Sequence, residues 1–251
     1  MPRLALCLSV VAVLWAALWG GLWLGCGPAF GAGAEAPQWQ AVLVAGDNAE
    51  PVFDNAVDAL AQWLAGRGVP GSDIHRLSAS RAPHDSTIEP ASAERVLQRI
   101  ASLRAQPGAG CLVFITSHGQ REEGVWLADS GEYLRPASLA RALSIGCPAA
   151  PSVVIVSACY SGGFTVGAMP APNRIILAAA RADRPSFGCQ ADRTYTVFDE
   201  CLLAALPRAP TWRAVYAASL GCVRARERQL QVLPSQPQAS FGAAVRDLAV
   251  R

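Results

Sequence analysis

The stretch VVIVSACYSGGF, residues 153–164, joins a run of apolar residues to a cysteine and a pair of glycines. The β-forming side chains at its start predict a strand that is buried on both faces, as strands of parallel sheets are. Cys159 follows where this strand ends, and Gly162 and Gly163 leave room for another backbone to approach closely. The stretch therefore predicts a buried strand that carries a cysteine to the edge of a sheet.

The same alternation of strand and helix runs through the rest of the chain. Residues 39–46 form an apolar run that ends in a glycine, and residues 53–68 place apolar side chains at steps of three and four, as a helix does. Further strand patterns occupy residues 74–78, 110–119, 123–129, 152–159 and 174–180, and further helical patterns occupy residues 91–105, 135–146 and 195–207. This order predicts an α/β fold with a mostly parallel sheet and helices on both faces.

Two of these strands end on residues that can carry chemistry. Residues 110–119 end on His118 and Gly119, and residues 152–159 end on Cys159. Ligands of open parallel sheets lie beyond the carboxyl ends of the strands, so both side chains could meet at one edge. A thiol beside an imidazole is a nucleophile with its base, because the thiolate is the reactive form. A cysteine after a strand is otherwise a small buried hydrophobe, and the presence of His118 favours the catalytic interpretation.

Several segments resemble the legumain-like cysteine peptidases, a family related to caspases, and in particular their exported bacterial branch. FITSHGQREEGVWLAD and VSACYSGG are similar to the His-Gly and Ala-Cys-x-Ser-Gly segments of caspases and legumains. LVAGDNAEPVFDNAVDAL and AARADRPSFGC are similar to the first strand and helix of legumains and to the segment after their catalytic strand. The resemblance runs from about Val42 to Val245, including the tail PSQPQASFGAAV, and implies a caspase-like three-layer sandwich.

The resemblance also implies catalytic roles. Cys159 would attack the carbonyl of a peptide or protein substrate, and His118 would protonate the leaving amine. The backbone N–H groups of Gly119 and Cys159 would hold the oxyanion. We expect no metal, because no cysteines or histidines have zinc-ligand spacing, and no cofactor.

The positions that bind the substrate side chain in legumains are partly changed here. Legumains bind asparagine through an Arg-His pair in the first helix and a Glu after the catalytic cysteine, and Asp54, Asn55 and Tyr160 hold these places. Asparagine specificity is therefore not expected. Asp54 either binds a basic side chain of the substrate or only interacts with the helix dipole. Ser186 matches a pocket-wall serine but equally suits a turn, and Ser117 stands where legumains have Asp.

Other polar residues are weaker candidates. His75 and His84 have no second ligand at metal spacing, so we expect solvated loop histidines. Arg181, Asp183 and Arg184 follow the predicted strand 174–180. This charged trio either borders the pocket or forms a structural ion-pair cluster.

Composition and charge exclude some classes of partner. The 251 residues, 52% of them hydrophobic, suffice for one sizeable core. The net charge is +2, and the 21 basic residues, all of them arginine, form no basic run. Nothing therefore predicts binding to nucleic acid.

An apolar segment opens the chain. After Arg3 an uncharged run extends to about Gly27 and predicts an export signal. The segment Ala-Gly-Ala at residues 32–34 suits cleavage by signal peptidase, Cys26 lies in a poor match to a lipoprotein site, and the run is long enough to remain as a membrane anchor. We therefore divide the chain into a signal peptide or membrane anchor, residues 1–36, and a caspase-like peptidase domain, residues 37–251. All three outcomes place the domain in the periplasm or otherwise outside the cytoplasm.

The cysteines leave two interpretations open. Of eight, Cys7 and Cys26 lie in the opening segment, and six remain. An even number indicates disulfides, but a reactive Cys159 would leave at least one other cysteine unpaired.

These features predict an exported cysteine-type endopeptidase that works through a thioacyl intermediate. The alternative is a catalytically idle caspase-like scaffold that binds a peptide or a partner in the cell envelope.

Overall fold

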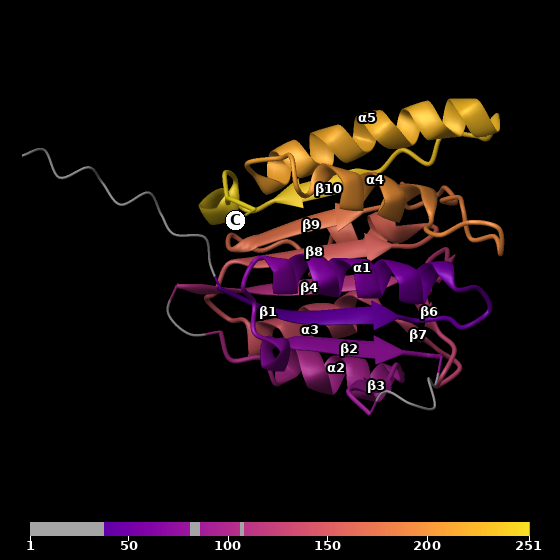
Figure 1. Cartoon of the computed structure of the whole chain (residues 1–251). Helices are drawn as coiled ribbons and strands as arrows, with labels where there is room; N and C mark the ends of the chain where they lie inside the picture. Colours follow the sequence, from indigo (N-terminus) through magenta and orange to yellow (C-terminus); the bar gives the residue numbers. More distant parts are fainter. Residues whose placement is uncertain (1–37, 81–85, 106–107, 251) are drawn as a thin grey trace, which may run out of the picture. The chain divides into compact units, whose positions relative to one another are not determined.

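The computed structural model describes residues 38–80, 86–105 and 108–250, and its main feature is a seven-stranded sheet (Figure 1). The strand order is β10-β9-β8-β4-β1-β2-β3. Only β10 runs antiparallel to its neighbour, and the other five pairs are parallel. The mostly parallel sheet that the sequence predicts is therefore confirmed. All described residues belong to one compact unit.

The central strands of this sheet are its most apolar part. Nearly all residues of β1, β4 and β8 are buried, because helices cover both faces of the sheet. The seven strands are β1 Gln38–Ala45, β2 Ile74–Ser78, β3 Ile88–Pro90, β4 Ala109–Thr116, β8 Ser152–Ser157, β9 Arg174–Ala178 and β10 Gln238–Phe241.

Helices form the two outer layers. On one face, α1 (Val52–Gly66), α4 (Val197–Ala205) and α5 (Trp212–Leu230) share a core with Leu43 of β1. On the other face, α2 (Ala93–Ala101) and α3 (Pro136–Gly146) share a core with Val42 and Val44 of the same strand. Figure 1 shows α1 in front of the sheet and α3 behind it. The molecule has the caspase-like three-layer sandwich that the resemblance implies.

A small antiparallel sheet follows β4. It consists of β5 (Gly119–Gln120), β6 (Gly124–Leu127) and β7 (Glu132–Leu134). The N–H of Ala128 donates to the carbonyl of Gly46 at 2.8 Å, and the Ser117 hydroxyl donates to the carbonyl of Trp126 at 2.7 Å. These bonds hold the small sheet against the carboxyl ends of β1 and β4.

Short 3₁₀ helices complete the described chain. They are η1 Gly71–Asp73, η2 Ser161–Thr165 and η3 Ala243–Val245. The segment η2 directly follows the predicted nucleophile.

Several elements have no counterpart in the sequence predictions. The helix α5 buries Ser219 and Glu227 along with its apolar residues, so its apolar pattern is weak. The strand β10 is only half-buried along its length, and β3, β5 and β7 have two or three residues each. Such short or partly polar segments lack the periodicity that predicts an element from sequence.

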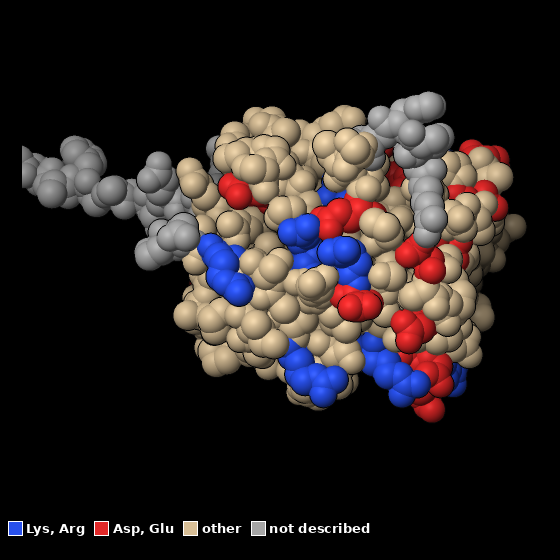
Figure 2. All heavy atoms as spheres, turned by 90° about the horizontal axis from the view of Figure 1, so that it is seen from below, with Lys and Arg blue, Asp and Glu red and all other residues tan. Residues whose placement is uncertain are grey.

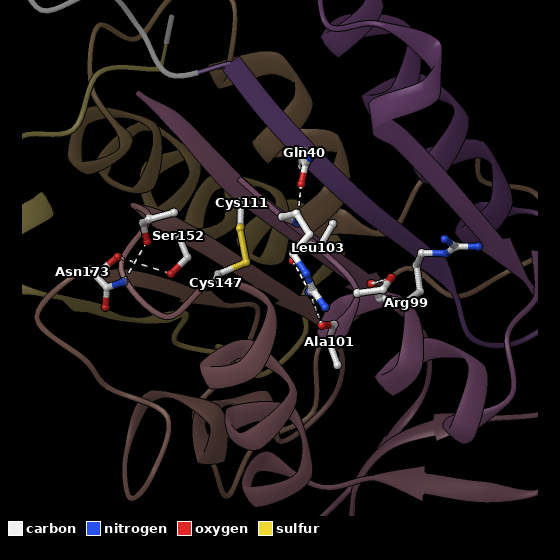
Figure 3. Close-up of a disulfide and its surroundings, with 11 residues drawn as sticks. Gln40, Arg99, Ala101, Leu103, Cys111, Cys147, Ser152 and Asn173 are labelled. Atoms are coloured by element: carbon white, nitrogen blue, oxygen red, sulfur yellow. Dashed lines mark hydrogen bonds between the residues drawn. A yellow bond between two sulfur atoms is a disulfide. The ribbon is translucent and has the colours of Figure 1, made fainter. Parts of the chain in front are cut away.

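Two disulfides pair four of the cysteines. Cys111, in β4, is bonded to Cys147, which follows α3 (Figure 3), and Cys201 of α4 is bonded to Cys222 of α5. Near the first bond, the Ser152 hydroxyl donates to the carbonyl of Asn173 at 3.3 Å. These groups lie at the amino ends of β4, β8 and β9, opposite the ends that carry the predicted diad. Cys159 and Cys189 are free thiols.

The face shown in Figure 2 is mostly uncharged, and both basic and acidic side chains are scattered over it. Within the three described ranges, no helix combines the length and apolar character needed to cross a membrane. The predicted leader, residues 1–36, falls outside these ranges.

Candidate active site

Neighbouring strand ends bring together the two residues that the sequence singles out. In the parallel pair β4 and β8, Thr116 lies opposite Ser157. His118 lies two residues after Thr116, and Cys159 lies two residues after Ser157. The same register therefore brings His118 and Cys159 together beyond the carboxyl edge of the sheet. The N–H of Ser117 donates to the carbonyl of Ser157 at 3.1 Å and continues the pairing past the end of β4.

Gly119 packs directly against the backbone of Cys159. A Cβ atom at this glycine would lie 2.1 Å from the carbonyl oxygen of Cys159, whereas Cβ contacts under 3.0 Å essentially do not occur. The close approach therefore requires glycine at this position. It also places the His-Gly turn in contact with the segment that carries the thiol.

Two backbone N–H groups beside the thiol are suited to hold an anion. Trp126 donates its N–H to the carbonyl of His118 at 3.0 Å. In an antiparallel ladder, hydrogen-bonded residue pairs alternate with pairs that are not hydrogen-bonded. The N–H of Gly119, the next residue, therefore points away from β6. Among the described residues, the N–H of Cys159 donates to no protein group. Unpaired donors of this kind form an oxyanion hole in acyl-transfer enzymes.

The imidazole of His118 is held from one side by α1. Its ring packs edge-on against the ring of Phe53, with centroids 5.4 Å apart. Phe53 is fully buried in the first turn of α1. The contact restrains the imidazole on the face of the sheet that α1, α4 and α5 cover.

The thiol of Cys159 is half-buried against Ser186. The N–H of Ser186 donates to Sγ at 3.3 Å, and the thiol in turn lies 3.5 Å from the carbonyl oxygen of Ser186, to which it donates. The Ser186 hydroxyl lies 3.7 Å from Sγ. Both the backbone and the side chain of Ser186 therefore lie against the sulfur. Ser186 is thus part of the site.

Tyr160 lies at the rim of this site. Its backbone is left-handed, with φ 58° and ψ 14°, and its N–H donates to the carbonyl of Arg184 at 2.8 Å. The guanidinium of Arg121, which sequence analysis does not single out, lies 5.4 Å from the centroid of the tyrosine ring. Arg121 also donates to the carbonyl of Asp183 at 3.0 Å, so it connects the loop after His118 to the loop after β9.

The structure does not bring Asp54 to the thiol. Its carboxylate accepts a hydrogen bond of 2.6 Å from the hydroxyl of Ser78, at the end of β2. The strands β1 and β4 lie between β2 and β8, which places β2 and β8 about 14 Å apart at ordinary strand spacing. Asn55, the next residue, donates through Nδ2 to the carbonyl of Thr194 at 3.0 Å.

The charged trio after β9 forms a local ion pair. Arg181 binds both carboxylate oxygens of Asp183, at 2.5 and 2.8 Å. The hydrogen bond from Arg181 lowers the pKa of Asp183 to about 2. Arg184 donates to the carbonyl of Pro234 at 3.0 Å. The sequence left open whether these residues border the pocket or form a structural ion-pair cluster, and Arg181 and Asp183 form an ion pair.

One expectation for the histidines is wrong. His75 lies in β2 and is half-buried, rather than in a solvated loop, and burial together with nearby Arg99 lowers its pKa. His84 lies outside the described residues. The described part of the chain has no group of three or more His, Cys, Asp or Glu side chains that could hold a metal ion.

Two further groups near the diad are not identified from the sequence. Cys189 has a pKa raised to about 12, first by burial and then by its electrostatic interactions with nearby Cys159 and Asp199. Asp199, in α4, is fully buried. Both residues look ordinary in the sequence, because one follows a glycine turn and the other occupies the first turn of a helix, where acidic residues are common.

Comparison with known families agrees with the resemblance in the sequence. Residues 95–208 match the model of the peptidase C13 family, the legumain family of cysteine peptidases. This segment includes both His118 and Cys159. The expected relation to legumain-like cysteine peptidases is therefore confirmed. No curated protein matches the chain.

Proposed function

We propose that the protein is an exported cysteine endopeptidase in which Cys159 is the nucleophile and His118 is the general acid and base. The observation that carries this proposal is the contact between Gly119 and the backbone of Cys159, beside two unpaired N–H groups. This contact supports an arrangement in which a thiol, an imidazole and two anion-binding N–H groups share one sheet edge. The match to a cysteine peptidase family supports the same chemistry.

The first half of the reaction forms a thioester. The proton of the Cys159 thiol passes to His118, and the thiolate attacks the carbonyl carbon of the scissile peptide bond. The negative charge on the carbonyl oxygen is held by the N–H groups of Gly119 and Cys159. As the carbon–nitrogen bond breaks, His118 gives its proton to the leaving amine, and the acyl group remains on sulfur.

The second half restores the enzyme. A water molecule gives a proton to His118 and attacks the thioester carbonyl. The carbon–sulfur bond then breaks, the carboxylic acid leaves, and the thiolate of Cys159 recovers the proton from His118. No group other than the diad and the two N–H donors is needed for this sequence.

Export is supported by the covalent structure of the domain. Disulfides persist in oxidising compartments and are rare in the cytosol. The bonds Cys111–Cys147 and Cys201–Cys222 therefore agree with the apolar leader predicted for residues 1–36. A fusion of residues 1–36 to a reporter enzyme that is active only outside the cytoplasm tests this part, and an inactive reporter would contradict it.

A peptide or protein is the proposed substrate, with a residue other than asparagine before the scissile bond. Neither Asp54 nor Asn55 offers the positive group that these positions hold in legumains, and both side chains already have protein partners. A preference for a basic residue through Asp54 stays a prediction. Turnover of matched peptides with Arg, Lys, Asn or Ala before the scissile bond tests both the exclusion of asparagine and the preference for a basic residue. A clear preference for Asn would contradict both statements.

A mechanism-directed probe separates the peptidase from an idle scaffold. We expect an acyloxymethyl ketone peptide to label Cys159, and we expect His118→Ala to abolish labelling while the fold is kept. Cys159→Ala should abolish peptide hydrolysis without a change in thermal midpoint, because a small side chain at a strand end contributes little packing. Full turnover by Cys159→Ala, or no labelling of the native protein, would refute the proposed function.

A further inference from the structure

A buried carboxylate lies at the junction of α4 with the ends of β4 and β8. Asp199 is 0% exposed, and its Oδ2 accepts a hydrogen bond of 2.7 Å from the hydroxyl of Thr116, the last residue of β4. Its own N–H donates to the hydroxyl of Thr196, the capping residue of α4, at 3.1 Å. The Thr196 and Ser157 hydroxyl oxygens lie 3.4 Å apart. One polar network therefore joins the start of α4 to both strand ends.

The strand residues in this network are the ones that precede the diad. Thr116 and Ser157 are opposite each other in the sheet, and each stands two residues before His118 or Cys159. Residues two apart in a strand point to the same face, so Asp199 lies beneath the diad on the face covered by α4. A shift of the carboxylate would be transmitted first to the two strand ends.

The carboxylate is held in surroundings that disfavour its charge. Burial raises the pKa of Asp199 to about 6, against the lowering effect of the Ser157, Thr116 and Thr196 hydroxyls. Its Oδ1 atom is buried and has no hydrogen-bond partner among the described residues. Cys189, on the preceding loop, is a further titratable group that interacts with it. A buried acid with an unpaired oxygen destabilises a fold, and groups of this kind are concentrated at functional sites.

We propose that Asp199 is a positioning residue, which acts through Thr116 and Ser157 to hold the strand ends that carry His118 and Cys159 at working distance. This inference rests on the proposed function of the diad. As an ionised carboxylate, Asp199 accepts from the Thr116 hydroxyl, and its backbone N–H holds the Thr196 hydroxyl that lies beside Ser157. A neutral amide lacks the charge that strengthens the bond from Thr116, so the end of β4 loses part of this restraint.

The test compares Asp199→Asn with Glu200→Gln. The control makes the same chemical change one residue along α4, where Glu200 forms surface ion pairs with Arg193 and Arg226. Three quantities are measured at pH 7.5: the rate at which iodoacetamide alkylates Cys159, followed by peptide mass spectrometry; kcat and KM on a peptide substrate; and the thermal midpoint. Asp199→Asn should slow both alkylation and kcat at least tenfold, with KM within twofold and an equal or higher midpoint. Glu200→Gln should change the rates less than twofold.

A second pair of variants covers the case in which Asp199→Asn fails to fold. Thr116→Ser keeps the hydroxyl that donates to Asp199, and Thr116→Val removes it with little change in shape. The valine variant should be slow and the serine variant should match the native protein.

Three outcomes would overturn the inference. The first is native alkylation and turnover rates in Asp199→Asn. The second is a loss of these rates that occurs together with a lower thermal midpoint. The third is equal rates in the two Thr116 variants. A native Cys159 that reacts no faster than free cysteine would instead refute the proposed function. The alkylation rate of the native protein thus distinguishes the two failures.

Discussion

Replacing Gly119 with alanine perturbs the active site by one methyl group at a defined place. The added carbon would lie 2.1 Å from the carbonyl oxygen of Cys159, and contacts under 3.0 Å essentially do not occur. The His-Gly turn and the cysteine segment must therefore separate by about 1 Å. A misplacement of that size between reacting groups costs about 100-fold in rate, which corresponds to about 3 kcal/mol of transition-state stabilisation.

A second glycine near the thiol provides the control. A Cβ atom at Gly163 would meet nothing within 4 Å, although this residue is only four positions after Cys159. The assay is kcat/KM on a fluorogenic peptide, together with the thermal midpoint of each variant. We expect about 100-fold loss for Gly119→Ala and less than threefold change for Gly163→Ala. A folded Gly119→Ala protein with activity within threefold of the native protein would refute the reasoning, because the two strand ends would then not need this contact.

Three further predictions concern stability. Gly221 is exposed in the middle of α5 with open space around it, so Gly221→Ala should stabilise the fold by about 1 kcal/mol and raise the thermal midpoint by roughly 3 °C; a lower midpoint would contradict this. Loss of the Cys201–Cys222 bond through a double serine substitution removes a closure of 21 residues and should lower the free energy of unfolding by about 3 kcal/mol in urea titrations, whereas an unchanged midpoint would show that the bond contributes nothing. Asp199 has a folded-state pKa of about 6 against an ordinary value of 3.8, so the folded protein binds more protons between about pH 4 and 6 and loses stability as the pH rises through this window. Asp199→Asn should therefore be more stable than the native protein by roughly 3 kcal/mol above pH 7 and by much less at pH 4, and a pH-independent difference would contradict this.

The central strands and their helices could be predicted because their signals are local. The apolar runs around Val113 and Val154 contain no polar residue over strand length, and α1 repeats its apolar residues at helical spacing. These patterns also predict where the strands end, which is why His118 and Cys159 could be named. The helix α5 has no such pattern, since Ser219 and Glu227 occupy part of its buried face.

The remaining parts of the site depend on how elements rotate when they pack. The buried face of α1, which includes Phe53, turns Asp54 toward β2 and leaves Asn55 beside Thr194. Sequence alone does not determine that rotation, so a match to the legumain pattern did not predict where the carboxylate lies. Asp199 was not identified for the same reason, because its burial comes from strands that lie more than forty residues earlier in the chain.

The disulfide between Cys111 and Cys147 closes a covalent ring that contains His118 but not Cys159. A protease that cut the exposed loop around Arg121 or Glu122 would therefore produce two fragments that stay joined. The nicked protein would migrate as a single species without reductant and as two species with it. The histidine and the cysteine of the diad would then reside on different polypeptides, linked through sulfur at the opposite end of the sheet, and without reductant the nicked molecule would differ in mass from the intact one by a single water.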